Sequence, residues 1–122
     1  DRFIDTDQKM TSSHIWAIRT REDLKYVGHG VLYPTEICRG SKEKEILFYL
    51  NKEFWKKGLA VEAGSLMLHF AFDILSYDCI WATIDSDHLA SKRVCEKIGM
   101  QLDRMGHDNE GNFLIMKCTR GS

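Results

Sequence analysis

The chain has 122 residues, a length that fits one domain over residues 1–122, and its 43% apolar and 29% charged residues are typical of a soluble globular protein. A formal net charge of −1 argues against nucleic acid as a partner. No apolar run is long enough to span a membrane and no signal peptide opens the chain, so we expect a cytoplasmic protein without a membrane partner.

The first half of the chain predicts three strands. Residues 1–13 are mostly polar, and we expect the end of a helix running into a loop there. Residues 14–19 and 26–33 alternate or run apolar on either side of a polar turn, which predicts two antiparallel strands ended by Pro34. Residues 45–50 form a nearly continuous apolar strand, which we expect to be central and buried on both faces.

A helix is expected to begin close to Gly58, because apolar and polar residues beyond it separate onto two faces at helical spacing. The apolar face is expected to comprise Leu59, Ala63, Leu66, Met67, Phe70, Ala71 and Ile74. The β-branched and aromatic run at residues 79–84 predicts the next strand. Because a helix connects strand 45–50 to strand 79–84, we expect these two strands to lie parallel and side by side.

The residues beyond this parallel pair predict a second helix and a closing hairpin. Asp87, preceded by Ser86, is the expected N-cap, and Gly99 is the expected C-terminal stop. The expected buried stripe of the helix comprises Ala90, Val94 and Ile98. Residues 100–105 and 112–118 predict a final antiparallel pair. The predicted fold class is therefore α/β (α+β), a mixed, mostly antiparallel sheet with a central parallel strand pair and packed helices.

The turn before the first helix, Trp-Lys-Lys-Gly-Leu-Ala at residues 55–60, has the chemistry of an anion site. A helix that begins after a glycine directs its unpaired N–H groups and the positive end of its dipole into the space beyond the strand. Gly58 permits close approach to the backbone, and Lys56 and Lys57 add positive charge, which would suit a pyrophosphate. The same residues also fit an ordinary surface turn, and neither common phosphate-binding glycine motif is present.

A second stretch of sequence points to a family. Residues 54–63, Phe-Trp-Lys-Lys-Gly-Leu-Ala-Val-Glu-Ala, are followed at residues 88–100 by His-Leu-Ala-Ser-Lys-Arg-Val-Cys-Glu-Lys-Ile-Gly-Met. Together they resemble the GNAT superfamily of acetyl-CoA-dependent N-acetyltransferases. The branch they resemble most contains the ribosomal-protein N-terminal acetyltransferases, which read approximately Y-W-G-K-G-Y-A-T-E-A and then N-x-x-S-x-R-V-L-E-K-x-G-F. The resemblance covers Ile15 to about Lys117.

The resemblance implies an acyl-CoA N-acyltransferase-like fold and transfer of acetyl from acetyl-CoA to a primary amine. The acceptor would be a protein N-terminus or a small-molecule amine, which attacks the thioester directly. The first strand and first two helices of the family, roughly fifty residues by ordinary element lengths, have no counterpart in this sequence. We therefore expect an N-terminally shortened domain, in which the acceptor side is affected more than the cofactor side.

For the cofactor, the resemblance assigns the pantetheine arm to the backbone of Leu50 and an oxyanion donor to the strand backbone near Tyr49 and Leu50. His88 stands where the branch prefers Asn, and Ser91 matches the serine of the branch. No metal is implied. The pyrophosphate is assigned to Trp55, Lys56, Lys57, Gly58, Leu59 and Ala60.

An alkylammonium has a pKa near 10, so the acceptor must lose a proton before or during attack. Glu45 matches an acidic position common in the branch and is our candidate base, although it also fits a solvated carboxylate at a charged strand start. Asp85 is the second candidate, because clefts in such sheets open at strand C-termini. Many members have a tyrosine acid where this chain has Cys95, which is more simply core filler, so Ser91 is the better polar candidate.

A second hypothesis is a CoA-binding or self-associating module without catalysis. It is supported by the shortened N-terminal part, by His88 and by the missing tyrosine acid. A shortened sheet also leaves an edge strand that another chain can pair with, so we expect a homodimer.

The cysteines are widely separated and show no C-x-x-C pair, which indicates free thiols. They are Cys38, Cys79, Cys95 and Cys118.

Overall fold

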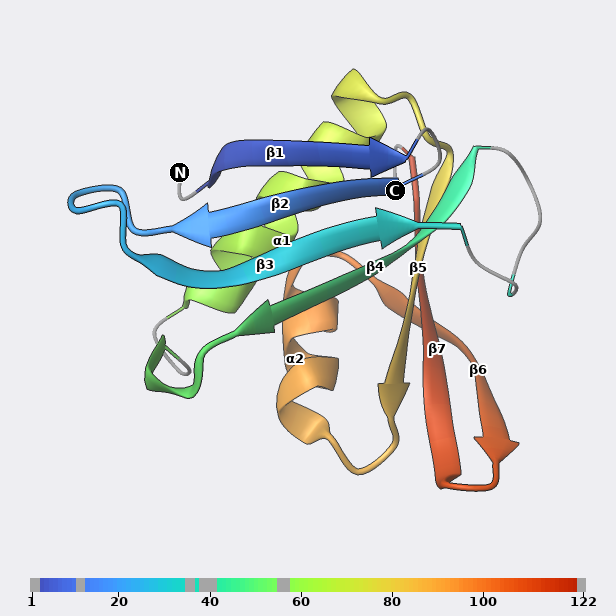
Figure 1. Cartoon of the computed structure of the whole chain (residues 1–122). Helices are drawn as coiled ribbons and strands as arrows, with labels where there is room; N and C mark the ends of the chain where they lie inside the picture. Colours follow the sequence, from blue (N-terminus) through green and yellow to red (C-terminus); the bar gives the residue numbers. More distant parts are fainter. Residues whose placement is uncertain (1–2, 11–12, 35–36, 38–41, 55–57, 121–122) are drawn as a thin grey trace.

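The structure is a computed structural model that describes residues 3–10, 13–34, 37, 42–54 and 58–120. Its elements run along the chain as shown in Figure 1. The strands are β1 Phe3–Met10, β2 Ser13–Arg19, β3 Tyr26–Tyr33, β4 Glu43–Leu50, β5 Cys79–Asp85, β6 Gln101–Asp108 and β7 Gly111–Thr119. The helices are α1 Leu59–His69 and α2 Leu89–Lys97, with a short 3-10 turn at Lys52–Phe54 and a π turn at Phe70–Ile74.

The described strands form one seven-stranded sheet in the order β1-β2-β3-β4-β5-β7-β6. Every neighbouring pair is antiparallel except β4 and β5, which run parallel because α1 carries the chain back across the sheet. The predicted fold class, with its central parallel pair, is confirmed.

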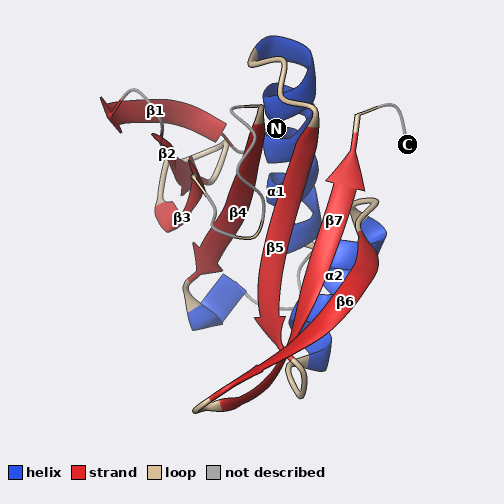
Figure 2. Cartoon of the chain, turned by 90° about the vertical axis from the view of Figure 1, so that its right-hand side faces the viewer, coloured by secondary structure: helices blue, strands red, loops and turns tan. Residues whose placement is uncertain are grey.

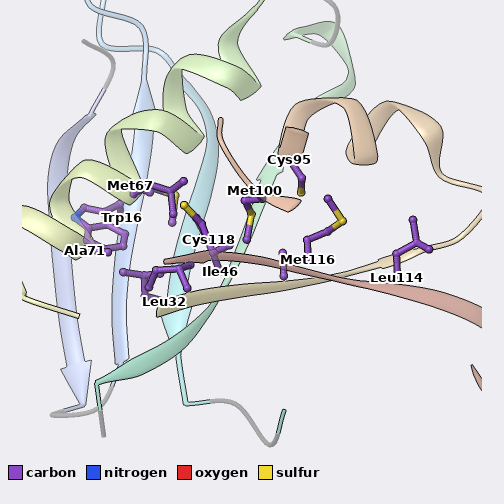
Figure 3. Close-up of a cluster of buried hydrophobic side chains, with 13 residues drawn as sticks. Trp16, Leu32, Ile46, Met67, Ala71, Cys95, Met100, Leu114, Met116 and Cys118 are labelled. Carbon is purple, nitrogen blue, oxygen red and sulfur yellow. The ribbon is translucent and has the colours of Figure 1, made fainter. Parts of the chain in front are cut away.

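Both helices pack on the same face of this sheet, and the main core lies between the two layers (Figure 2). Met67 of α1 and Ala71 of the π turn meet Ile46 of β4 and Leu32 of β3 there, as Figure 3 shows. Burying a Leu, Ile or Met side chain fully, rather than leaving it exposed, stabilises the fold by about 1.5–3 kcal/mol. Trp16, 3% exposed, belongs to the same core.

The parallel pair separates after a short contact. β4 and β5 are paired only from Glu43–Cys79 to Glu45–Trp81, whereas β3 and β4 stay paired from Tyr33–Glu45 to Gly28–Leu50. Figure 1 shows the two parallel strands diverging toward their C-terminal ends. Beyond Glu45 the second half of β4 is therefore no longer paired with β5, and this break in the pairing is here called the opening.

The opposite face of the sheet is not covered by either helix. Along β4, Ile46 and Leu50 face the helices and are buried, while Leu47 and Tyr49 are 56% and 53% exposed on the other face. The prediction of a central strand is confirmed, but the prediction that it is buried on both faces is wrong. A continuous apolar run suggested two covered faces, whereas the described helices cover one.

The N-terminal prediction is also wrong. Residues 3–10 form β1, which pairs antiparallel with β2 and places Thr6 opposite Trp16. The segment is too polar to show a strand pattern, because an edge strand is held mainly by backbone hydrogen bonds to its neighbour. Residues 3–10 could therefore be predicted as a strand only from the position of β2, whose backbone they pair with.

The first helix begins at Leu59, as predicted, but the expected apolar stripe fails at its end. The chain widens into a π turn in which the N–H of Leu75 donates to the carbonyl of Phe70, five residues back, at 3.0 Å. This extra residue rotates the side chains of the turn, so Ile74 is 60% exposed. Leu68, which precedes the turn and lies outside the predicted stripe, is 5% exposed.

The second helix departs from its prediction at its first turn. Its N-cap is His88 rather than Asp87, and Ala90 is exposed. The buried residue of this helix is Cys95, while Val94 and Ile98 are half-buried. α2 lies close to α1, because a Cβ at Gly64 would already be 3.0 Å from Cδ1 of Ile98. The predicted stop at Gly99 is confirmed by its φ of 103°.

Candidate functional site

The C-terminal ends of β4 and β5 lie at the same end of the sheet, and each strand leads into a helix there (Figure 1). The N-termini of α1 and α2 therefore lie on either side of the opening where the two strands separate. Strand C-terminal ends flanked by helix N-termini are where ligands bind in open α/β sheets. The candidate residues fall around this opening.

Gly58 closes the turn that starts α1. It adopts a left-handed conformation with φ 76°, its carbonyl accepts the Glu62 N–H at 3.1 Å, and no side-chain hydrogen bond caps the helix. A Cβ at this position would meet no atom within 4 Å. The backbone is therefore approachable at a helix N-terminus, as an anion site requires. Trp55, Lys56 and Lys57 lie outside the described residues.

Leu59 fixes where the helix begins relative to the strand. Its side chain is 4% exposed and packs with Leu50, and Ala60 packs against the same small core. The Leu59 side chain therefore serves the fold, and its contribution to ligand binding would come from backbone N–H. This packing places the start of α1 beside the end of β4.

At the other side of the opening, His88 and Ser91 form a polar pair at the start of α2. The Ser91 Oγ lies 3.1 Å from His88 Nδ1, and the His88 N–H donates to the Asp85 carbonyl at 3.0 Å. His88 and the Asp85 side chain are both exposed. These three predicted residues therefore lie together.

Glu45 stands where the parallel pairing ends, because its pairing with Trp81 is the last between β4 and β5. Its side chain is on the helix-free face, the opposite side from Ile46. The hydroxyl of Tyr33, directly across from it on β3, donates a hydrogen bond to the Glu45 side chain. Burial and this carboxylate raise the pKa of Tyr33.

The neighbouring carboxylate has a different partner. The indole Nε1 of Trp81 donates to Glu43 Oε1 at 2.9 Å, and Trp81 is 6% exposed. Lys117 Nζ and the Arg104 guanidinium lie 5.2 and 5.7 Å from the centre of the Trp81 ring. The indole hydrogen bond ties Glu43 to the Trp81 packing, which leaves Glu45 as the carboxylate beside the opening.

Glu45 and Asp85 do not lie together. Asp85 is four residues beyond the Trp81 position of β5, and a strand rises about 3.3 Å per residue, which separates the two rows by roughly 13 Å. The two carboxylates therefore cannot both contact one reacting nitrogen. Glu45 is nearer the point where the strands part.

Sequence reasoning missed two residues of this region, Tyr33 and Gly28. Gly28 is opposite Leu50, and a Cβ there would lie 1.9 Å from the Tyr49 carbonyl oxygen. Only a residue without a side chain permits this approach of β3 to the end of β4. The signal for both residues is the hairpin register, which residue type alone does not give.

Cys95 occupies the position that the resemblance gives to a tyrosine acid. The side chain is 4% exposed within the main core, and burial, aided by the nearby Glu96 charge, raises the pKa of the thiol to about 11. The prediction that Cys95 fills the core is confirmed. Cys79 and Cys118 are also buried free thiols, and Cys38 lies outside the described residues.

The remaining features of the described residues add no ligand site at this opening. A hollow of about 190 Å³ lies at the start of β6, away from every candidate residue. In the part of the chain that the structure describes, no group of three His, Cys, Asp or Glu side chains is arranged to hold a metal ion. Across those same residues, every helix is too short or too polar to cross a membrane.

The sequence family described as Acetyltransferase (GNAT) domain matches residues 1–101, more than half of the chain. The chain belongs to the GNAT acetyltransferase family. YnaD, an uncharacterized N-acetyltransferase of Bacillus subtilis (strain 168), is 32% identical to this GNAT chain over 81 residues, which are 66% of the chain and 46% of YnaD. YkkB, an uncharacterized protein of the same strain, is 28% identical over 90 residues, 74% of the chain and 52% of YkkB. The chain thus spans about half the length of these relatives.

Solved structures agree with the family. A GNAT family acetyltransferase from Bacillus anthracis superposes with a TM-score of 0.80 at 25% identity, covering 88% of this GNAT chain and 67% of that chain. Aminoglycoside acetyltransferase AAC(6')-Ib in complex with coenzyme A gives 0.78 at 18% identity, covering 89% and 67%. A spermidine N-acetyltransferase mutant from Vibrio cholerae gives 0.80 at 14%, covering 91% and 68%. The two lower identities show the fold alone, so the narrower resemblance to ribosomal-protein N-terminal acetyltransferases stays a prediction.

Proposed function

We propose that this GNAT chain transfers the acetyl group of acetyl-CoA to a primary amine by direct attack. The observation that supports this most is the opening between β4 and β5, which begins at Glu45 and is bordered by the helix start at Gly58. A related fold has been solved with coenzyme A bound. In this proposal the pantetheine arm enters the opening beside Leu50 and the pyrophosphate meets the backbone N–H groups of Leu59 and Ala60.

The opening also supplies polar backbone for the reaction. Successive residues of a strand direct their backbone N–H and C=O groups alternately toward the strands on its two sides. Beyond Glu45, every second residue of β4 therefore directs these groups toward the opening, where β5 is no longer paired with it. A backbone N–H near Tyr49 or Leu50 is the proposed donor to the oxygen of the tetrahedral intermediate. One such donor is worth about 10²–10³ in kcat where it has been removed.

Glu45 is the proposed base. It takes the proton that the ammonium must lose, directly or through one water, while the amine nitrogen bonds to the thioester carbon and the CoA sulfur leaves. Ser91, hydrogen-bonded to His88, is the proposed proton donor to the departing thiolate, because Cys95 is buried in the core. Asp85 stays the second candidate base.

The alternative is a module that binds CoA without catalysis. It is favoured by Cys95, which stands where many members of the family have a tyrosine acid. Because Cys95 is buried, this position presents no exposed proton donor. Acetyl-CoA binding without thiol release in the presence of amines would support this alternative.

Thiol release from acetyl-CoA, measured with a panel of α-amines, polyamines and aminoglycosides, tests the proposal. Glu45→Gln should retain acetyl-CoA binding and lose about 10²–10⁴ in turnover, the usual contribution of a general base. Glu43→Gln is the matched control, since an amide oxygen can still accept from Trp81 and the same charge is removed two residues away. A normal rate for Glu45→Gln removes Glu45 from the mechanism.

A further inference from the structure

We infer that Tyr33 is a positioning residue for the reaction, because its phenol holds the Glu45 carboxylate in place at the point where β4 and β5 part. The inference rests on the proposed function, in which Glu45 is the base. Tyr33 lies outside the two motifs at residues 54–63 and 88–100, and it enters the region only through the pairing of β3 with β4.

The geometry of the sheet places the two side chains together. Tyr33 and Glu45 are register partners, and side chains of directly opposed residues extend from the same face of a sheet. The phenol donates and the carboxylate accepts. Because β3 and β4 remain paired from Tyr33–Glu45 to Gly28–Leu50, this contact lies on the side of β4 that stays paired rather than on the side where β5 separates.

The groups on the other side of Glu45 are already engaged with one another. Trp81, its partner on β5, donates to Glu43, and the cations Lys117 and Arg104 lie over the Trp81 ring. The indole N–H is therefore directed at the other carboxylate. Tyr33 is the side chain on β3 that orients Glu45.

The phenol acts as a fixed donor rather than as an acid. Burial and the Glu45 charge both raise the pKa of Tyr33, so it keeps its proton across the range in which amines react. A carboxylate has about four acceptor sites, so one phenol hydrogen bond leaves capacity for the proton of the amine. Holding a base in a productive orientation is a recognised source of rate.

A double-mutant cycle tests the inference. Tyr33→Phe should lower kcat about tenfold and leave the KM for acetyl-CoA within about twofold, because only the orientation of the base changes. In the Glu45→Gln background, Tyr33→Phe should have no further effect. Tyr77→Phe is the matched control: Tyr77 is also half-buried with a pKa raised by burial, but it is outside the proposed site, and its rate should be unchanged. A wild-type rate for Tyr33→Phe, or an equal loss in both backgrounds, overturns the inference.

A titration independent of turnover complements the cycle. The Tyr33 ring, labelled with ¹³C and assigned by its absence in Tyr33→Phe, should titrate at lower pH in Glu45→Gln than in the wild type. Identical titrations would overturn the contact. A chain that neither binds acetyl-CoA nor releases thiol would instead overturn the proposed function and the catalytic role of Tyr33, while this titration still decides whether the phenol holds Glu45.

Discussion

Two carboxylates of the same type, two residues apart on one strand, have different partners in this protein. Glu43 accepts from the buried indole of Trp81, and Glu45 accepts from the half-buried phenol of Tyr33 at the edge of the opening. The sequence favours Glu45 only through its family position, since both residues belong to one charged strand start. Long-range register, which residue type does not reveal, is what distinguishes them.

The anion site can be tested at a single residue. Gly58→Glu should abolish acetyl-CoA binding, because the new side chain blocks the backbone and its charge repels a pyrophosphate. A non-glycine residue at φ 76° costs about 1–2 kcal/mol, so the fold should survive. Calorimetric titration measures the binding and circular dichroism the fold.

Two controls separate the causes of this loss. Gly58→Asn introduces a residue that tolerates the left-handed conformation and adds a side chain without charge, so it should weaken binding less than Gly58→Glu does. Ser65→Glu adds the same charge at an exposed position of α1 and should bind as the wild type does. Unchanged affinity in Gly58→Glu would place the cofactor elsewhere.

Cys95 separates a structural role from a chemical one. Cys95→Ala should leave turnover within about twofold and destabilise the core by about 1 kcal/mol, since a small buried side chain is removed. Turnover with a saturating amine measures the first effect and urea unfolding at pH 7 the second. A hundredfold loss of turnover would make the thiol part of the chemistry.

The same variant predicts a pH effect. Folding raises the pKa of the Cys95 thiol from 9.0 to about 11, so in this window the folded protein retains a proton that the unfolded chain has lost. This contribution to stability is present below pH 9 and is lost as the pH rises toward 11. The free energy of unfolding should therefore fall less steeply over this range in Cys95→Ala, and equal slopes would contradict the assignment.

At the scale of elements, the opening exists because β4 stays paired with β3 after its pairing with β5 has ended. Gly28 is central to this arrangement, since a Cβ there would lie 1.9 Å from the Tyr49 carbonyl oxygen and 2.9 Å from Leu50 Cα. Backbone atoms cannot move aside as a flexible side chain can. The end of β4 is therefore sensitive to any side chain at position 28.

Gly28→Ala should destabilise the fold by about 1–3 kcal/mol, the usual cost of overpacking, and should weaken acetyl-CoA binding by displacing the end of β4. Gly30→Ala, on the same strand, is the matched control, because its nearest neighbours are the Sδ and Cε atoms of Met67, which can move. Urea unfolding compares the two variants. Equal losses would show that contact with the β4 backbone is unimportant.

The elements that were predicted correctly have strong local signals. Strands 26–33 and 79–84 and the helix start at Gly58 follow from alternation, β-branched content and a glycine turn. The elements that were missed depend on tertiary context. The strand β1 forms because it pairs with the edge of β2. The π turn at Phe70–Ile74 changes which residues of the helix face the core, and the residue types there do not indicate such a turn. Among the candidate site residues, motif spacing indicated Gly58 and Ser91, but hairpin register was needed for Tyr33.

At the scale of the whole molecule, the described sheet has β1 and β6 at its edges and one face that neither helix covers. Leu102 and Met105 of β6 are 49% and 60% exposed. Edge strands with exposed apolar residues are where another chain can add. We therefore propose a homodimer, to be tested by light scattering over a wide concentration range. A constant monomer mass would contradict it.

The central claim is that the opening between β4 and β5, closed at one end by the start of α1, binds acetyl-CoA. Calorimetric titration of the purified chain with acetyl-CoA, with CoA and a simple nucleotide as comparisons, tests it most directly. Saturable binding of both acetyl-CoA and CoA, stronger than that of the nucleotide and lost in Gly58→Glu, is the predicted result. Absence of acetyl-CoA binding by a folded chain would contradict the claim.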